Sequence, residues 1–365
     1  MAASIHSRIC EFATTALIHI FAFPYAAVCE LYCSAIDDAN KWDHVQIAHY
    51  IGISIVAQET GFSEAPEISE GQNKPYSVQF CQADPCTDDL ESHLQHKGIP
   101  VDIVCCLHHL ELCFESEEKA RKLVQNVSSL LKPGGYFFGI VPDSSTIWTK
   151  YQKNVEASLH KGGGTKSNIL PNYIRSENYV ITFEVEEDKF PSFGKRYQLK
   201  FANEASFHSH CLVHFPSLIR LAREAGLEYI EIQNLTEFYD DNRAQFAGLL
   251  SNYAPNLLDP RGKLLPRSFD ILGLYSIFVF QKPDPDAAPP LLTPPLLAYE
   301  DPSYDEQEWV GEGYMQPAAS IDEEIRSQME TGMVTPVIAA VAGNTDVGEQ
   351  EKGILGPGPA DLRLP

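Results

Sequence analysis

Apolar positions along the first 282 residues follow two alternating spacings. Residues 8–22, 117–131 and 216–225 carry apolar side chains three and four positions apart, which predicts amphipathic helices. Short apolar runs between and around them predict strands at residues 27–33, 49–55, 76–80, 101–107, 136–141, 229–233 and 274–281. Strands that alternate with helices are typical of parallel β-α-β units, so we expect an α/β fold with a mostly parallel sheet. The two closing strands predict an antiparallel hairpin at its edge.

Two stretches break this pattern. Residues 150–215 are polar and rich in loops, with strand-like pieces at 179–184 and 195–201, and we expect a substrate-side insertion that closes over the substrate. Residues 283–365 hold 16 acidic residues, 3 basic residues and 12 of the 25 prolines. Because this tail lacks the apolar periodicity that offsets ordering entropy, we expect it to be disordered, which leaves residues 1–282 as the folded domain.

The net charge of −23 is divided between these parts, with −13 in the tail and −10 in residues 1–282. An acidic chain lacks the basic footprint of a general nucleic-acid binder, so any contact with RNA must depend on a local site. The nine cysteines and the His pairs at 108–109 and 208–210 show no zinc-binding spacing, which predicts reduced thiols and no bound metal. The apolar run before Pro24 is too short for a membrane span.

Residues 130–139, Leu-Leu-Lys-Pro-Gly-Gly-Tyr-Phe-Phe-Gly, predict a helix end, a sharp turn and a strand. This arrangement, late in a series of strands and helices, is typical of class I S-adenosylmethionine-dependent methyltransferases. Further motifs stand at Asp102–Leu107, Phe114–Ser116, Leu131–Ser144, Phe190–Tyr197, Leu212–Pro216, Phe238–Tyr239 and Tyr275–Lys282. In this order they resemble the eukaryotic mRNA cap guanine-N7 methyltransferases in their plant form, over residues 8–282.

The resemblance implies a Rossmann-like fold, S-adenosylmethionine as cofactor, the capped 5′ end of RNA as substrate, and a place in the nucleus. It implies that the cofactor contacts seven residues, namely Thr14, Tyr32, Ser34, Ser54, Asp84, Leu107 and Leu112. It implies that the cap or its phosphates contact Lys41, Glu115, His210 and Tyr275. The residue pattern alone leaves other interpretations open: Asp84 also suits a turn before a proline, Lys41 a solvated surface, and Tyr275 a core position.

Several of these residues differ from the family pattern. Tyr32, Ser34 and Ile36 stand where glycines let the backbone approach the cofactor, and Ser54 stands where an Asp takes the ribose hydroxyls. On the cap side, His210 replaces an acid. These differences leave open an alternative function, that of a catalytically weakened or inactive methyltransferase-fold protein that acts as a binding or scaffold partner.

The implied reaction needs no catalytic acid or base. Guanine N7 is an unprotonated lone pair at neutral pH, and a sulfonium methyl group is an activated electrophile. The protein has to align N7, the methyl carbon and the sulfur in line and exclude water. We therefore predict methylation of N7 of the cap guanine by in-line transfer, without a catalytic side chain. Methylation of a small molecule or of another RNA position is a third possibility.

Overall fold

The structure is a computed structural model. It describes residues 5–33, 36–55, 75–94, 100–160, 172–184, 189–202 and 207–286. From position 287 onward, the predicted acidic tail lies outside the described residues.

Seven strands form one sheet, in the order β10 (Glu228–Asn234), β11 (Tyr275–Gln281), β5 (Leu131–Pro142), β4 (Val101–Cys106), β1 (Ala27–Leu31), β2 (His49–Ser54) and β3 (Ser77–Gln82). Strands β1 to β5 are parallel, whereas β11 is antiparallel to both of its neighbours. This confirms the predicted α/β class, with a mostly parallel, Rossmann-like sheet. The chain runs outward from β1 to β3 and returns to β4 on the other side of β1, so the strand order reverses between β1 and β4.

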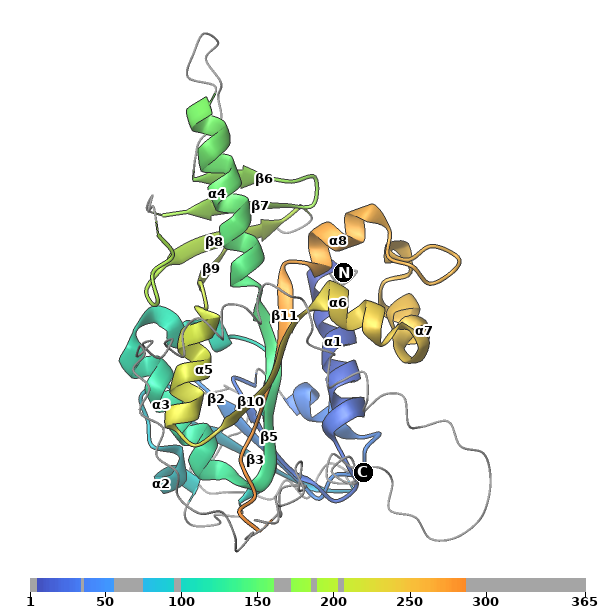
Figure 1. The fold of residues 1–365 in the computed structure, drawn as a ribbon. Coiled ribbons are helices and arrows are strands. Elements are labelled where there is room, and N and C mark those ends of the chain that lie inside the picture. Colours follow the sequence, from blue (N-terminus) through green and yellow to red (C-terminus); the bar gives the residue numbers. More distant parts are fainter. Residues whose placement is uncertain are drawn as a thin grey trace, which may run out of the picture. The chain divides into compact units, whose positions relative to one another are not determined.

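Helices cover both faces of this sheet (Figure 1). One face carries α1 (Ile5–Phe21), and the other carries α3 (Glu117–Leu130), α5 (Phe215–Glu224) and the short α2 (Leu90–Leu94). The apolar side of α1 packs on β5, where the rings of Phe21 and Phe138 stack with centroids 5.1 Å apart. Because both faces are covered, the parallel strands appear in the sequence as nearly continuous apolar runs.

Two glycines of the motif at residues 130–139 are required by backbone geometry. Gly134, with φ of +79°, lies near the start of β5, where the register of its pairing with β4 shifts between Leu131 and Tyr136. Gly139 lies against β4, where an added Cβ would sit 1.9 Å from the carbonyl oxygen of Cys106. The motif therefore allows β5 to pack closely on β4, and it supplies no reactive group.

The predicted insertion contains a second sheet. Its four antiparallel strands are β6 (Tyr173–Arg175), β7 (Tyr179–Phe183), β8 (Arg196–Phe201) and β9 (His208–Cys211). The strand-like pieces predicted at 179–184 and 195–201 correspond to β7 and β8, whereas β6 and β9 are too short to show a clear alternation. The long helix α4 (Ser144–His160) precedes this sheet and was missed by the sequence pattern. Closure of the insertion over a substrate stays a prediction.

The two closing strands, β10 and β11, pair antiparallel at one edge of the sheet, as predicted. They are not joined by a tight turn, because the connection holds α6 (Leu235–Asp241), α7 (Arg243–Tyr253), the 3-10 helix η4 (Pro255–Leu257) and α8 (Pro266–Leu272). In addition, β11 lies inside the sheet between β10 and β5, so of these two strands β10 alone lies at an edge. The apolar run of β11 reflects this interior place, since five of its seven residues are large apolar side chains that are all buried.

One carboxylate ties the insertion to the C-terminal helices. Asp270 in α8 accepts hydrogen bonds from Tyr179 Oη at 2.7 Å and from Asn178 Nδ2 at 3.3 Å, and pairs with Lys150 Nζ of α4 at 3.1 Å. Although its partial burial alone would raise the pKa of Asp270, these donors, together with the Ser176 hydroxyl, hold it below its ordinary value. Segments far apart in the sequence therefore meet at one anionic side chain.

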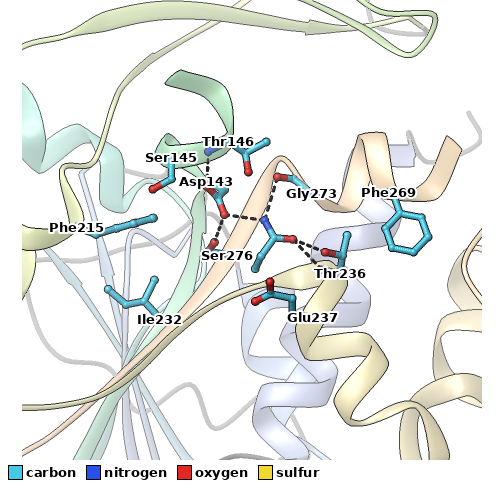
Figure 2. Close-up of a pocket in the computed structure, with 11 residues that line it drawn as sticks. Asp143, Ser145, Thr146, Phe215, Ile232, Thr236, Glu237, Phe269, Gly273 and Ser276 are labelled. Atoms are coloured by element: carbon cyan, nitrogen blue, oxygen red, sulfur yellow. Dashed lines mark hydrogen bonds between the residues drawn. The ribbon is translucent and has the colours of Figure 1, made fainter. Parts of the chain in front are cut away.

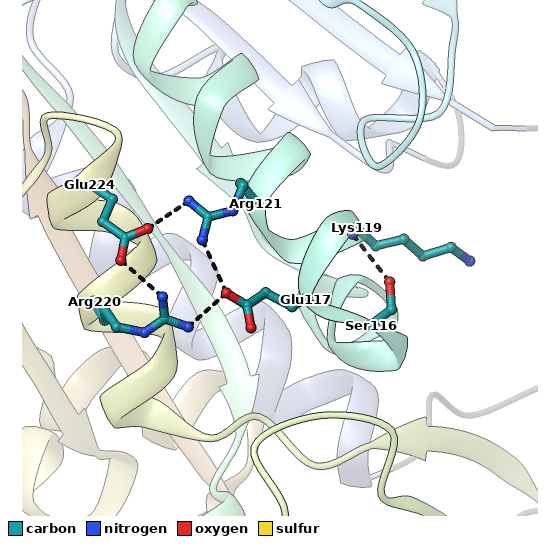
Figure 3. Close-up of polar contacts among 6 residues, drawn as sticks. All are labelled: Ser116, Glu117, Lys119, Arg121, Arg220 and Glu224. Atoms are coloured by element: carbon teal, nitrogen blue, oxygen red, sulfur yellow. Dashed lines mark hydrogen bonds and ion pairs between the residues drawn. The ribbon is translucent and has the colours of Figure 1, made fainter.

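Two arginines and two glutamates join α3 to α5 (Figure 3). Arg121 pairs with Glu117 on its own helix at 3.0 Å and with Glu224 on α5 at 2.5 Å. Arg220 of α5 pairs with Glu117 at 2.9 Å and with Glu224 at 2.8 Å. Each of the four side chains thus contacts both arginines or both glutamates, which makes a closed clamp on the protein surface.

This clamp should add a small, salt-sensitive stability. Arg220→Gln removes two of its ion pairs, so we expect Tm to fall by about 1–2 °C at low ionic strength. In 1 M NaCl the difference should shrink, because exposed charges are screened. Thermal unfolding followed by circular dichroism measures both values. Arg223→Gln removes the same charge from the same helix outside the clamp and is the control; an equal loss in that variant would contradict a role for the clamp.

Candidate functional site

Four residues predicted to contact the cofactor lie at one edge of the large sheet. Tyr32 follows β1, Ser54 ends β2, Asp84 follows β3 and Leu107 follows β4. Because these strands are parallel, their carboxyl ends meet at the same edge, beside the reversal of strand order between β1 and β4. In doubly wound sheets, ligands bind outside the carboxyl ends at such a reversal. This crevice is the candidate site.

The other predicted cofactor residues are placed less directly. Thr14 is buried in the middle of α1. Leu112 lies on the 3-10 helix η3 (Leu110–Glu115), where 39% of it is exposed. Ser34 lies outside the described residues. Contact between these side chains and a cofactor stays a prediction.

Tyr32 directly follows β1 and contacts two other segments at the same edge of the sheet. Its φ of +61° is the left-handed conformation that glycine adopts without strain. Its hydroxyl shares a hydrogen bond of 2.9 Å with Cys86 Sγ, in the turn after β3. Its ring meets the His109 imidazole, which follows β4, edge to face with centroids 6.4 Å apart. The Tyr32 side chain therefore reaches from the end of β1 to the segments that follow β3 and β4, and only 6% of it is exposed.

A buried acid on β1 holds Lys41. Glu30 is 1% exposed, and its Oε2 accepts hydrogen bonds from Tyr50 Oη at 3.0 Å and from Trp42 Nε1 at 3.5 Å. Its Oε1 lies 3.8 Å from Lys41 Nζ, at the end of the 3-10 helix η1 (Ile36–Trp42). The predicted cap contact Lys41 is therefore positioned next to the strand that ends in the crevice.

Asp84 forms a turn. Its Oδ1 accepts a hydrogen bond from the Cys86 amide at 2.9 Å, and its own amide donates to Asp88 Oδ2 at 2.8 Å. These bonds are the side-chain turn expected for an Asp before a proline. They fix the loop after β3 at the crevice, whether or not Asp84 also contacts a ligand.

His210, predicted on the cap side, is bound to a buried carboxylate. Its Nδ1 lies 2.8 Å from Glu111 Oε1, and His109 Nδ1 lies 3.7 Å from the same oxygen. Glu111 is 3% exposed. Burial alone would raise its pKa, but the two histidines outweigh burial and hold the pKa of Glu111 well below its ordinary value. Sequence analysis missed Glu111, although an acid within the apolar run Leu110–Phe114 was a visible signal.

The two remaining cap-side residues lie on different elements. Glu115 ends η3 and pairs with Lys119 and with Arg196 of β8. Tyr275 begins β11 opposite Pro142 of β5 and is 4% exposed. Glu115 and His210 are thus brought together through η3 and the insertion sheet, whereas Tyr275 is placed by the large sheet.

A cavity of about 510 Å³ lies farther along the same edge, at the ends of β5, β10 and β11 (Figure 2). Its walls include Asp143, Asn234, Ser276, Phe215 and Phe269. None of the predicted site residues lines it. Because neighbouring residues of a strand point to opposite faces, Ser276 faces this cavity and Tyr275 faces the other side of the sheet.

The polar groups of this cavity mostly hold the fold. Asp143 Oδ1 accepts from the Thr146 amide at 2.7 Å at the start of α4, and its Oδ2 accepts from Asn234 Nδ2 at 2.6 Å and Ser276 Oγ at 2.7 Å. Asn234 Oδ1 in turn caps α6 by accepting from the Thr236 amide. Asp143 thereby joins β5, β10 and β11, and this accounts for its burial without a ligand.

Among the described residues, no group of three or more His, Cys, Asp or Glu side chains is arranged to hold a metal ion. A search of the same residues for a helix long and apolar enough to cross a membrane finds none.

Comparison with known proteins assigns the family. The model of the mRNA (guanine-N(7))-methyltransferase domain matches residues 13–283. The chain belongs to this family. A protein from Oryza sativa subsp. japonica called mRNA cap guanine-N(7) methyltransferase 2 is 61% identical over the full length of both chains. A protein of the same name from Arabidopsis thaliana is 57% identical over 98% of this chain and 96% of its own.

More distant members of the cap methyltransferase family match less of the chain. The Arabidopsis protein called mRNA cap guanine-N(7) methyltransferase 1 is 29% identical over 73% of this chain and 71% of its own.

A solved S-adenosylmethionine-dependent methyltransferase from Clostridium acetobutylicum covers 77% of this chain and 94% of its own. Its sequence identity is 11% and its TM-score is 0.39, a likeness that bears on neither the fold nor the site.

The buried carboxylate at the cap side should make stability depend on pH. Glu111→Gln keeps the shape and removes the charge that pairs with His109 and His210, so we expect a loss of about 1–3 kcal/mol in the free energy of unfolding at pH 7. Since the folded-state pKa of Glu111 is lowered, its contribution is fully present above the ordinary value of 4.5 and is lost as pH falls through the folded-state pKa.

Urea unfolding of both proteins from pH 7 to pH 3 checks this prediction. Glu111 also raises the pKa of His109 from its ordinary value of 6.5, so the pair stabilises most where Glu111 is ionised and His109 is protonated. The difference between wild type and variant should therefore narrow below pH 4.5, as Glu111 gains a proton, and also toward pH 7, as His109 loses its proton. Glu228→Gln, at an exposed position of β10, is the control and should change little at any pH. A difference that widens below pH 4.5 would contradict the assignment.

Proposed function

We propose that this chain methylates N7 of the guanine cap of mRNA with S-adenosylmethionine as methyl donor. The observation that carries the proposal is the similarity to the rice and Arabidopsis cap methyltransferases over essentially the whole chain. The class I topology of the large sheet supports it. The scaffold alternative is not favoured, because relatives at 61% and 57% identity carry the name of the enzyme.

The described conformation does not fit the donor. Donors of this class bind outside the carboxyl ends at the reversal of strand order. Here the Tyr32 side chain spans that place and is 6% exposed, and a side chain stands where the family has glycine. S-adenosylmethionine supplies an activated methyl group once bound. The contacts of Thr14, Ser34, Ser54, Asp84, Leu107 and Leu112 with it are part of the proposal.

On the cap side, four residues are proposed to hold the substrate: Lys41, Glu115, His210 and Tyr275. The Lys41 ammonium lies beside Glu30 at the end of η1 and would meet the phosphates that link the cap to the RNA. Glu111 fixes the orientation of the His210 ring by binding Nδ1, so that the ring is set before a guanine arrives. In each case the side chain positions the cap guanine, which accepts the methyl group, and takes no proton.

The charge of the folded part favours recognition of the cap over the RNA backbone. Residues 1–282 carry a net charge of −10, which gives little general attraction for a polyanion. We infer binding that depends weakly on salt, in contrast to proteins that make many phosphate contacts. We also infer a nuclear location, from the role of capping in RNA synthesis.

Transfer of a labelled methyl group tests the proposed function. Capped GpppA-RNA should accept the label from S-adenosylmethionine, whereas the same RNA with a cap already methylated at N7 should not. This control leaves every other RNA position available. Label on the N7-methylated cap or on uncapped RNA would contradict the proposal. The absence of label from every substrate would contradict it as well.

Lys41 provides a second test. Lys41→Met removes the cation proposed to meet the cap phosphates, so kcat/KM for capped RNA should fall about tenfold or more. Lys153→Met, which removes an exposed lysine of α4, should leave kcat/KM unchanged. Because Lys41 also pairs with Glu30, Tm of each variant is measured as well. A wild-type kcat/KM in Lys41→Met would exclude its role.

A further inference from the structure

We propose that Tyr32 is a gate of the donor crevice, and that its ring has to leave the crevice before the methyl donor binds. This rests on the proposed function, since the ligand is S-adenosylmethionine or its product S-adenosylhomocysteine. The gate is inferred from the conformation of Tyr32, which directly follows β1 and stands where the family resemblance implies glycine.

The position of the ring defines the gate. Tyr32 directly follows β1, His109 follows β4, and the strand order reverses between these two strands. The two rings meet edge to face with centroids 6.4 Å apart, so their contact joins the segments after β1 and β4 at the point where the strand order reverses. A ligand at that place and the Tyr32 ring exclude each other.

The backbone at Tyr32 is under strain. Its φ of +61° lies in the region where a Cβ is unfavourable, and a tyrosine there is held by its surroundings. The chain offers a direct comparison in Tyr25, which has φ of +66° but is 78% exposed. The two tyrosines share the same backbone strain, and only Tyr32 is enclosed.

Two contacts latch the ring in the crevice. The Tyr32 hydroxyl shares a hydrogen bond with Cys86 Sγ at 2.9 Å, and a thiol is a weak partner that a hydroxyl exchanges readily for water. The second contact, His109, is itself held by Glu111 at 3.7 Å. The Tyr32 side chain is thus held by a weak hydrogen bond to Cys86 and by contact with the His109 ring, which Glu111 holds in place. This combination suits a side chain that opens and closes.

Calorimetric titration with S-adenosylhomocysteine tests the gate without methyl transfer. Apparent affinity falls with the fraction of molecules that are open, so Tyr32→Gly should bind about tenfold or more tightly than wild type. Cys86→Ala keeps the ring and removes one latch, so its affinity should lie between the two. Cys86→Ser restores a partner for the hydroxyl and should bind as wild type does.

Tyr25→Gly is the matched control, because it relieves the same backbone strain away from the crevice and should bind as wild type does. Stopped-flow binding gives an independent signature: the observed rate should level off with ligand concentration in wild type and rise linearly in Tyr32→Gly. If Tyr32→Gly fails to fold, the comparison of Cys86→Ala with Cys86→Ser decides.

Two outcomes would overturn the gate: no gain in affinity for Tyr32→Gly and Cys86→Ala over wild type, or an equal gain in Tyr25→Gly. The proposed function fails separately. If Tyr32→Gly binds S-adenosylhomocysteine more tightly yet neither protein methylates capped RNA, the gate stands and cap methylation is refuted.

Discussion

The buried, ionised carboxylate of Glu111 links the segment that follows β4 to the insertion sheet. It is buried between His109, which follows β4, and His210, which belongs to β9 of the insertion. A buried charge is costly unless it is paired, and here the pairing partners come from both sheets. The same carboxylate braces the His109 ring that packs on Tyr32. One side chain thus joins the segment after β4 to the insertion sheet and holds the two histidine rings beside it.

The crevice shows how far a site can change while its scaffold stays. The strand order and the meeting of carboxyl ends place the site, and the residues that follow each strand decide what fits there. Tyr32 changes what fits at the site, and it leaves the place of the site in the sheet unchanged. Membership of the cap methyltransferase family and a crevice filled by a side chain are therefore compatible, provided that the ring moves.

Several polar residues in suggestive places do structural work. Asp84 closes a turn, and Asp143 joins three strands and starts α4. Each was identifiable in the sequence as an acid after an apolar strand, a pattern that ligand-binding acids share. The hydrogen-bond partners separate the two residues. Asp143 engages both carboxylate oxygens within the chain, whereas the turn at Asp84 engages Oδ1, so the proposed contact of Asp84 with the cofactor stays open.

The sequence by itself determined the sheet class, the places of most strands and the family. The spacing of apolar positions and the order of motifs are local properties, so both can be recognised directly in the sequence. Only the tertiary structure decided that β11 lies inside the sheet and that a buried Glu111 binds two histidines. It also decided that the Tyr32 side chain is buried against the segments that follow β3 and β4. Those facts depend on contacts between residues far apart in sequence, such as the 99 positions between Glu111 and His210, which no local pattern records.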